Sequence, residues 1–118
     1  MNVLETVEAL YRALSDGDVE WFERHTIRTS IYVGVGSAYW MTGTALLAEL
    51  HRQFKEQSMQ WTTDVVLINE IGDVAWVLDR PVIHFDDGSE MQCRSTMVFL
   101  RNDQIWQLTH SHLSVGAD

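Results

Sequence analysis

Apolar residues in the first part of the chain repeat at the spacing of an α-helix. Four of them, at intervals of four, three and four residues, fall on one face of a helix with 3.6 residues per turn. They are Val3, Val7, Leu10 and Leu14. The pattern predicts a first helix over residues 2–15. Gly17 suits the left-handed end of that helix, and Asp18 is the expected N-cap of a short second helix.

One strand and a third helix are predicted before residue 58. Residues 27–35 contain a run of β-branched and aromatic side chains, which favours a strand. Residues 45–57 have an apolar stripe on one side and charged residues on the other, as in an amphipathic helix. Thr42 and Thr44, on either side of Gly43, offer a cap for this helix.

From Ser58 onwards the pattern changes to strands joined by short polar turns. The predicted strands cover residues 60–69, 74–85, 90–101 and 105–115. Their connections contain Gly, Asn or Asp, which are hairpin signals, so an antiparallel meander is expected. We therefore expect a single α+β domain over residues 1–118. In it, three helices from the N-terminal half pack against a cone-shaped, curved antiparallel sheet.

Composition and charge narrow the class of protein. The 118 residues suffice for one self-contained core, and 46% of them are hydrophobic. Eight Lys and Arg against seventeen Asp and Glu give a net charge of −9, which argues against nucleic acid and anionic membranes as partners. No signal peptide or membrane span is expected. Cys93 is the only cysteine, so we expect no internal disulfide and a cytoplasmic location.

Two segments carry a resemblance to a known family. They are Ala13-Leu14-Ser15-Asp16-Gly17-Asp18 and Trp106-Gln107-Leu108-Thr109-His110-Ser111-His112-Leu113-Ser114. With the order of elements, they resemble the nuclear transport factor 2-like (NTF2-like) superfamily, and within it the SnoaL-like and ketosteroid isomerase-like group. The second segment is also similar to the closing strand of the calcium/calmodulin-dependent kinase II association domain. The resemblance implies a cystatin/NTF2-like roll whose cone holds a small-molecule site and needs no cofactor.

The ketosteroid isomerase mechanism does not carry over residue by residue. That enzyme uses an aspartate as base, with a tyrosine and a protonated aspartate as oxyanion hole. The matching positions here are Gly34, Leu10 and either Ser95 or Thr96, with Tyr11 one position from the tyrosine. The resemblance therefore implies a protein that is not a true ketosteroid isomerase.

His110 and His112 are the predicted catalytic residues. Two apart on one strand, they would share a face with Trp106 and Leu108 and enter the cone if that face is concave. A histidine titrates near neutral pH and can act as general acid or base. The alternative is that they contact neighbouring strands or a partner subunit. A metal site with His84 as third ligand is a weaker option, and no metal is expected.

Five further residues are predicted to bind the ligand. They are Tyr32, Trp40, Trp76, Arg80 and Arg94. The aromatic residues could line the pocket, with Trp40 as a lid, and the arginines could hold an anionic group. A three-residue turn would set Arg80 opposite Arg94 and His84 opposite Glu90, whereas a two-residue turn would interchange the faces. Ordinary salt bridges of the arginines to Asp79 or Glu90 are the alternative.

The predicted function is binding of a small, mostly apolar organic ligand, with an anionic group as an option. Cofactor-independent isomerase, cyclase or hydratase/dehydratase chemistry on it is the enzymatic form of this prediction. The alternative is a non-catalytic ligand-binding or dimerisation module. A homodimer is expected through the bare side of the sheet. The residues expected on that side are Gln107, Thr109, Ser111 and Leu113.

Overall fold

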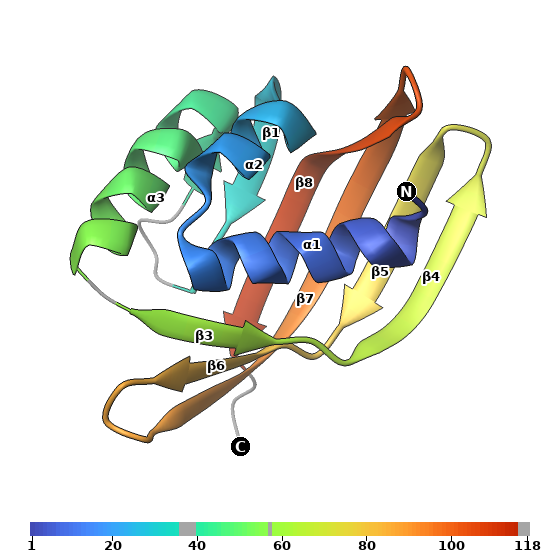
Figure 1. The fold of residues 1–118 in the computed structure, drawn as a ribbon. Helices are drawn as coiled ribbons and strands as arrows, with labels where there is room; N and C mark the ends of the chain where they lie inside the picture. Colours follow the sequence, from blue (N-terminus) through green and yellow to red (C-terminus); the bar gives the residue numbers. More distant parts are fainter. Residues whose placement is uncertain (36–39, 57, 116–118) are drawn as a thin grey trace.

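The computed structural model describes residues 1–35, 40–56 and 58–115. It has three helices on the concave side of a strongly curved sheet (Figure 1), as the sequence predicts. The helices are α1 (Val3–Asp16), α2 (Val19–His25) and α3 (Gly43–Glu56). The strands are β1 (Thr26–Val33), β2 (Trp40–Thr42), β3 (Met59–Thr62), β4 (Val65–Ile71), β5 (Val74–Asp79), β6 (Val82–Phe85), β7 (Glu90–Asn102) and β8 (Ile105–Val115).

Local signals set the limits of the first two helices. Asn2 and Glu5 form a capping box, in which the Glu5 amide donates to Asn2 Oδ1 at 2.8 Å and the Asn2 amide donates to Glu5 Oε1 at 3.0 Å. Gly17 ends α1 in the left-handed conformation, with φ of 71°. Asp18 caps α2 by accepting from the Trp21 amide at 3.1 Å. Both predicted caps are therefore confirmed.

The sheet is mixed rather than purely antiparallel. Its order is β2-β1-β8-β7-β5-β4, and β6 pairs with both β3 and β7. The predicted hairpins β4–β5 and β7–β8 are present, but β1 lies parallel to β8. The two predicted strands at 60–69 and 74–85 are each split into two. The second break falls at Arg80 and Pro81, because proline has no N–H for a sheet hydrogen bond.

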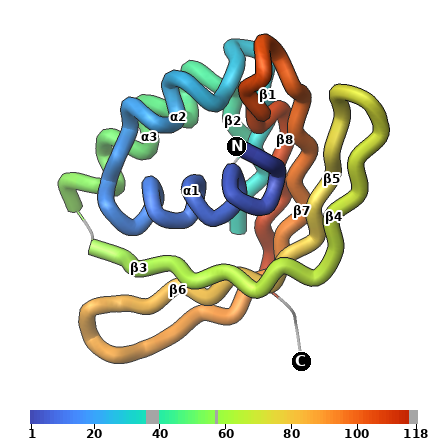
Figure 2. Tube along the Cα trace, turned by 45° about the vertical axis from the view of Figure 1, so that its right-hand side comes forward, coloured from blue at the N-terminus to red at the C-terminus, as the bar shows by residue number. Residues whose placement is uncertain are grey.

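The breaks give the sheet its curvature. The long strand β7 continues through both parts, pairing with β5 and β8 along one half and with β6 near its start. Figure 2 shows β3 and β6 turned across the lower side of the molecule, so that the chain surrounds α1. The register sets His84 opposite Glu90, as the three-residue-turn alternative predicts.

A β-bulge in β8 reverses which side chains face the concave side. Phe99 pairs with Leu108 but Val98 pairs with His110, so Thr109 is an extra residue in β8. The inward row therefore runs through Leu108 and continues at Ser111. Beside it β1 is irregular between Thr26 and Ile31. There the Ser30 hydroxyl donates to the Leu108 carbonyl at 2.7 Å and accepts from the Ile27 amide at 3.0 Å.

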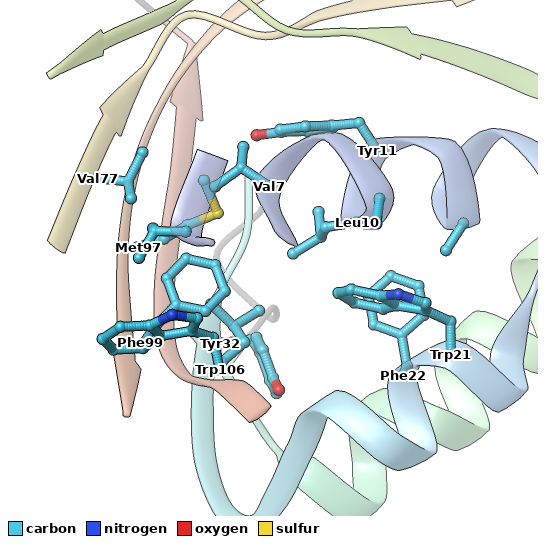
Figure 3. Close-up of a cluster of buried hydrophobic side chains, with 14 of the residues drawn as sticks. Val7, Leu10, Tyr11, Trp21, Phe22, Tyr32, Val77, Met97, Phe99 and Trp106 are labelled. Carbon is cyan, nitrogen blue, oxygen red and sulfur yellow. The ribbon is translucent and has the colours of Figure 1, made fainter. Parts of the chain in front are cut away.

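The core lies between α1, α2 and the concave face of β5, β7 and β8. Figure 3 shows Val7 and Leu10 of α1 facing Met97 and Phe99 of β7. Val7 and Phe99 are each fully buried. None of the helices in the described segments is long and apolar enough to cross a membrane.

The start of α3 is held against β1 by a close backbone approach. A Cβ added at Gly43 would lie only 2.2 Å from the Ile27 carbonyl oxygen. Only glycine fits this contact without movement of the backbone. The helix begins at this glycine, two residues before the predicted start.

Candidate functional site

A cavity of about 350 Å³ lies on the concave side of the sheet, under α1 and α3. This volume is at the lower end of the roughly 300–1,000 Å³ typical of small-molecule sites. Most of the side chains that line it are aliphatic or aromatic, and they come from all three helices and from strands on both parts of the sheet. The cavity is thus built to take a small, mostly apolar molecule.

Methionines form a large share of this wall. Met41, Met59, Met91 and Met97 all line the cavity, and the fifth methionine of the chain, Met1, is 70% exposed at the N-terminus. Methionine is flexible and polarizable, so such a wall can adjust to ligands of somewhat different shape.

A buried polar cluster lies at the Tyr11 side of the cavity. Tyr11 and Ser95 line the cavity, while Asp79 lies behind them at the end of β5 and is only 2% exposed. The hydroxyls of Tyr11 and Thr63 come close enough to favour the charged form of Asp79. Neither reaches good hydrogen-bond geometry, and both Asp79 carboxylate oxygens are buried without a partner among the described residues. This carboxyl group is therefore unusually poorly compensated.

The environment shifts the pKa of both acidic groups in the cluster. Burial raises the pKa of Asp79, against the smaller opposing effect of the Tyr11 and Thr63 hydroxyls. Burial, and after it the charge of Asp79, raise the pKa of Tyr11 well above its ordinary value. Tyr11 is therefore a neutral phenol in the resting protein, and Asp79 takes up a proton more readily than an exposed aspartate.

Two residues that line the cavity each carry a buried polar atom with no partner in the described part of the chain. They are the Tyr32 hydroxyl and the Trp61 indole nitrogen Nε1, both buried. Burial raises the pKa of Tyr32 to about 12. Trp61 packs against Tyr11, with ring centroids 5.9 Å apart. The polar groups of Tyr11 and Trp61 thus belong to one aromatic wall.

Glu49 of α3 is the one charged residue among the described cavity-lining residues. Arg52 bonds to it along the helix, and that hydrogen bond lowers the pKa of Glu49. Glu49 is therefore ionised at neutral pH. Arg52 also bonds to Glu56 at 2.6 Å, so two carboxylates share this guanidinium.

The family model for the SnoaL-like domain matches residues 3–118. The chain belongs to the SnoaL-like domain family. This family includes isomerases and dehydratases. No curated protein matches this SnoaL-like domain significantly.

Solved structures agree with this assignment of the fold. A Streptomyces avermitilis protein of the NTF2-like family, proposed to be a dehydratase, superposes with a TM-score of 0.88 at 21% identity, covering 98% of this chain and 94% of that one. An NTF2-like protein of unknown function in nutrient uptake from Rhodospirillum rubrum gives 0.83 at 21% identity, covering 99% and 100%. A proposed calcium/calmodulin-dependent kinase II association domain from Thiobacillus denitrificans gives 0.85 at 13% identity, covering 98% and 96%. At these identities the likeness shows the fold alone.

The two histidines predicted to be catalytic lie outside the cavity of this SnoaL-like domain. Beyond the β8 bulge, Ser111 and Leu113 line the cavity, so His110 and His112 lie on the opposite face of the sheet. The expectation that they share a face with Trp106 and Leu108 is wrong, because simple alternation does not account for the extra residue. Because of the same bulge, Ser111 and Leu113 face the cavity and do not lie on the expected dimer face.

Of the five predicted ligand-binding residues, only Tyr32 lines the cavity. Trp40 is 73% exposed in β2, and Trp76 belongs to the outward row of β5. Arg80 is exposed and binds Asp64 at 2.8 Å, which is an ordinary salt bridge with a different partner from those expected. Arg94 is exposed and donates to Ser114 Oγ at 3.1 Å. Tyr39, which precedes Trp40 in the sequence and is a further aromatic candidate for the pocket lining, lies outside the described residues.

The metal alternative also finds no support in the geometry of the described segments, where no three His, Cys, Asp or Glu side chains come together as a metal site. His84 instead contacts Thr62 at 3.0 Å and Glu90 at 3.3 Å.

Sequence reasoning missed the cluster around Asp79, although a signal was present. Asp79 follows Ala75 and Val77 at a spacing of two, in the row of β5 that turns out to be buried. An aspartate in an apolar strand row is a candidate for a shifted pKa. In the sequence, Tyr11 stands out only as the neighbour of Leu10, the position that matches the ketosteroid isomerase tyrosine. Nothing in the pattern connects it with a strand more than sixty residues away.

Proposed function

We propose that this domain binds a small, mostly apolar organic molecule in the cavity and performs acid–base chemistry on it with Tyr11 and Asp79. The reaction would be of the isomerase, cyclase or dehydratase type, with Tyr11 and Asp79 as the groups that give and accept protons at an oxygen of the ligand. The observation that carries the proposal is that Tyr11 lines the cavity while Asp79, buried behind it, lacks hydrogen-bond partners for both carboxylate oxygens.

The protonation state of Asp79 would set what Tyr11 offers to the ligand. When Asp79 carries a proton, it can donate to the Tyr11 oxygen, and the phenol hydrogen is free to donate to a ligand oxygen. When Asp79 is ionised, it attracts the phenol hydrogen, and the Tyr11 oxygen can accept from the ligand. A proton can thus pass through Tyr11 without a tyrosinate, which the raised pKa of Tyr11 disfavours.

Binding can be tested with the uncharged fluorescent molecule N-phenyl-1-naphthylamine. Leu113 lines the cavity, whereas Leu4 is 43% exposed on α1. We expect saturable binding to the natural protein and to Leu4→Trp. Leu113→Trp, which fills the cavity, should weaken binding at least about tenfold. Circular dichroism checks that both variants fold. Equal binding by Leu113→Trp would contradict the proposal.

The acid–base step can be tested by hydrogen exchange of 2-acetylnaphthalene in D₂O. Enolisation passes a methyl proton to a solvent base while Tyr11 donates to the carbonyl oxygen. We expect exchange above the buffer rate, reduced by about 10²-fold or more in Tyr11→Phe, since acid–base catalysis contributes roughly 10²–10⁴-fold. Exchange that is unchanged in Tyr11→Phe would contradict a role of Tyr11 and leave binding as the function.

A dimerisation role is the second candidate, and the outer face of the sheet supports it. We define this outer face by Ile31, Trp76, Leu78, Val98, His110 and His112, which the strand register places side by side. Trp76 and Val98 are half-buried, and Leu78 is 38% exposed. From Gln92 onward in β7, and along β8, the outward residues include Arg94 but no carboxylate, although the chain has net charge −9. Glu90, at the start of β7, contacts His84 of β6. Two copies would repel each other least through this face, so we propose a homodimer formed here.

A further inference from the structure

We infer that the ligand of the cavity is an uncharged molecule with a carbonyl, ether or hydroxyl oxygen, and that the cavity rejects carboxylates of the same shape. The inference rests on the proposed function and specifies the class of ligand. It replaces the expectation of an anionic group held by Arg80 and Arg94, since neither arginine reaches the cavity.

The described lining of the cavity contains no cationic side chain to neutralise an anion. None of its described lining residues is lysine, arginine or histidine. Residues 36–39, 57 and 116–118, which the structure does not describe, contain none of these residue types in the sequence. Arg52, the cation bonded to Glu49, is also bonded to Glu56. A carboxylate in the cavity would therefore lose its hydration without gaining a cationic partner, which is strongly unfavourable.

Negative groups in and behind the wall add to this rejection. Glu49 lines the cavity and is ionised at neutral pH, because its bond to Arg52 lowers its pKa. Asp79 lies directly behind Tyr11 and Ser95. A neutral ligand avoids repulsion from both carboxyl groups, whereas an anion meets repulsion from Glu49 and from Asp79 when the latter is ionised.

Unpartnered polar atoms of two lining residues favour an oxygen on the ligand. Trp61 Nε1 can only donate, and it is buried with no partner among the described residues. Tyr32 is 4% exposed, and its hydroxyl makes no hydrogen bond of good geometry, although the Ser30 and Thr26 hydroxyls lie near it. Neighbouring atoms cover Nε1, so a small shift of Trp61 on binding would bring the indole N–H to a neutral ligand oxygen, whereas a plain hydrocarbon leaves it unpaired. Sites with unpaired buried polar groups discriminate strongly against ligands that lack the matching atom.

Three molecules of nearly the same shape separate these effects: 2-acetylnaphthalene, 2-naphthoate and 2-isopropylnaphthalene. Binding can be followed by NMR of ¹³C-methyl-labelled methionine. Met41, Met59, Met91 and Met97 report on the cavity, and the exposed Met1 is an internal control. At pH 7 the ketone should bind at least about tenfold more tightly than the carboxylate, because the carboxylate loses its hydration without gaining a cationic partner. The ketone should also bind several-fold more tightly than the hydrocarbon, because only the ketone can accept a hydrogen bond.

Two variants assign the effects to residues. Trp61→Phe keeps an aromatic ring but removes the N–H, so the ketone should lose its advantage over the hydrocarbon. Trp76→Phe, on the outer face, is the matched control and should keep that advantage. Glu49→Gln should narrow the gap between ketone and carboxylate.

The outcomes distinguish the inference from the proposed function. Carboxylate binding as tight as ketone binding, with shifts of the four cavity methionines, overturns the inference and leaves a ligand-binding cavity. A ketone advantage that persists in Trp61→Phe overturns the assignment of the acceptor to Trp61. Failure of all three molecules to shift the cavity methionines overturns the proposed function itself.

Discussion

Replacing Asp79 by asparagine is expected to stabilise the fold at neutral pH while it disables the site. Most buried carboxylates are paired with a cation or with several donors, so removing one usually destabilises a protein. Asp79 is 2% exposed, its two carboxylate oxygens have no hydrogen-bond partner in the described structure, and burial raises its pKa. Asparagine has nearly the same shape and carries no charge. A gain in stability with a loss of function is the behaviour expected of a strained functional residue.

The size of the gain follows from the unsatisfied atoms. A buried polar group without a partner costs about 1–3 kcal/mol, and more if it is charged. The nearby hydroxyls of Tyr11 and Thr63 offset part of this cost for the ionised carboxylate. We therefore expect Asp79→Asn to raise the free energy of unfolding by about 1–3 kcal/mol at pH 7.

The effect should depend on pH with a defined sign. Because the pKa of Asp79 is raised in the folded state above its ordinary value of 3.8, protonation of Asp79 favours folding. That contribution is complete below pH 3.8 and is lost as the pH rises through the folded-state pKa. The variant should therefore gain most over the natural protein near neutral pH, and the difference should shrink as the pH falls toward 4.

Urea unfolding followed by circular dichroism from pH 4 to pH 8 measures this difference. Asp86→Asn, in the exposed turn after β6, changes the net charge equally and should show little effect. If Asp79→Asn is destabilised at pH 7 by more than about 1 kcal/mol, with the same pH dependence as the Asp86 control, Asp79 is a well-paired structural carboxylate. The acid–base role proposed for it would then be refuted.

Three further predictions concern the dimer, the reaction and the packing of α3. Val98→Glu on the outer face should give a 13.6 kDa monomer in sedimentation velocity, while the control Leu4→Glu should stay dimeric. A natural protein that is itself monomeric would contradict the proposed homodimer. An ultraviolet assay should show no enzymatic isomerisation of 5-androstene-3,17-dione, because the position that matches the catalytic base of ketosteroid isomerase is Gly34, which lines the cavity. Turnover well above the buffer rate would contradict this expectation. Gly43→Ala should lower the free energy of unfolding by about 1–3 kcal/mol, since its Cβ would overlap the Ile27 carbonyl, and an unchanged urea midpoint would contradict that contact.

The features that the sequence predicts well are those fixed by neighbouring residues. The apolar repeat from Val3 to Leu14 and the caps at Gly17 and Asp18 act within one or two helical turns, and the structure confirms them. The hairpin between β7 and β8 follows from its polar turn in the same way. The family resemblance added the three-dimensional arrangement, which no local pattern contains.

The features that failed depend on contacts between distant segments. Strand alternation predicts that His110 shares a face with Leu108, and one extra residue at Thr109 moves it to the other face. The parallel pairing of β1 with β8 joins segments about eighty residues apart, and the Ser30 hydroxyl stabilises it by bonding to Leu108. The approach of Tyr11 to Asp79 is of the same kind, so the candidate site emerges only from the folded chain.

A crystal structure of the protein with 2-acetylnaphthalene would show directly whether the cavity binds an uncharged, mostly apolar molecule. We expect the naphthalene to lie among the cavity methionines, with the ketone oxygen about 2.7–3.2 Å from Trp61 Nε1 or the Tyr11 hydroxyl. A cavity that contains only water, with the molecule bound on the outer face of the sheet or not at all, would contradict it.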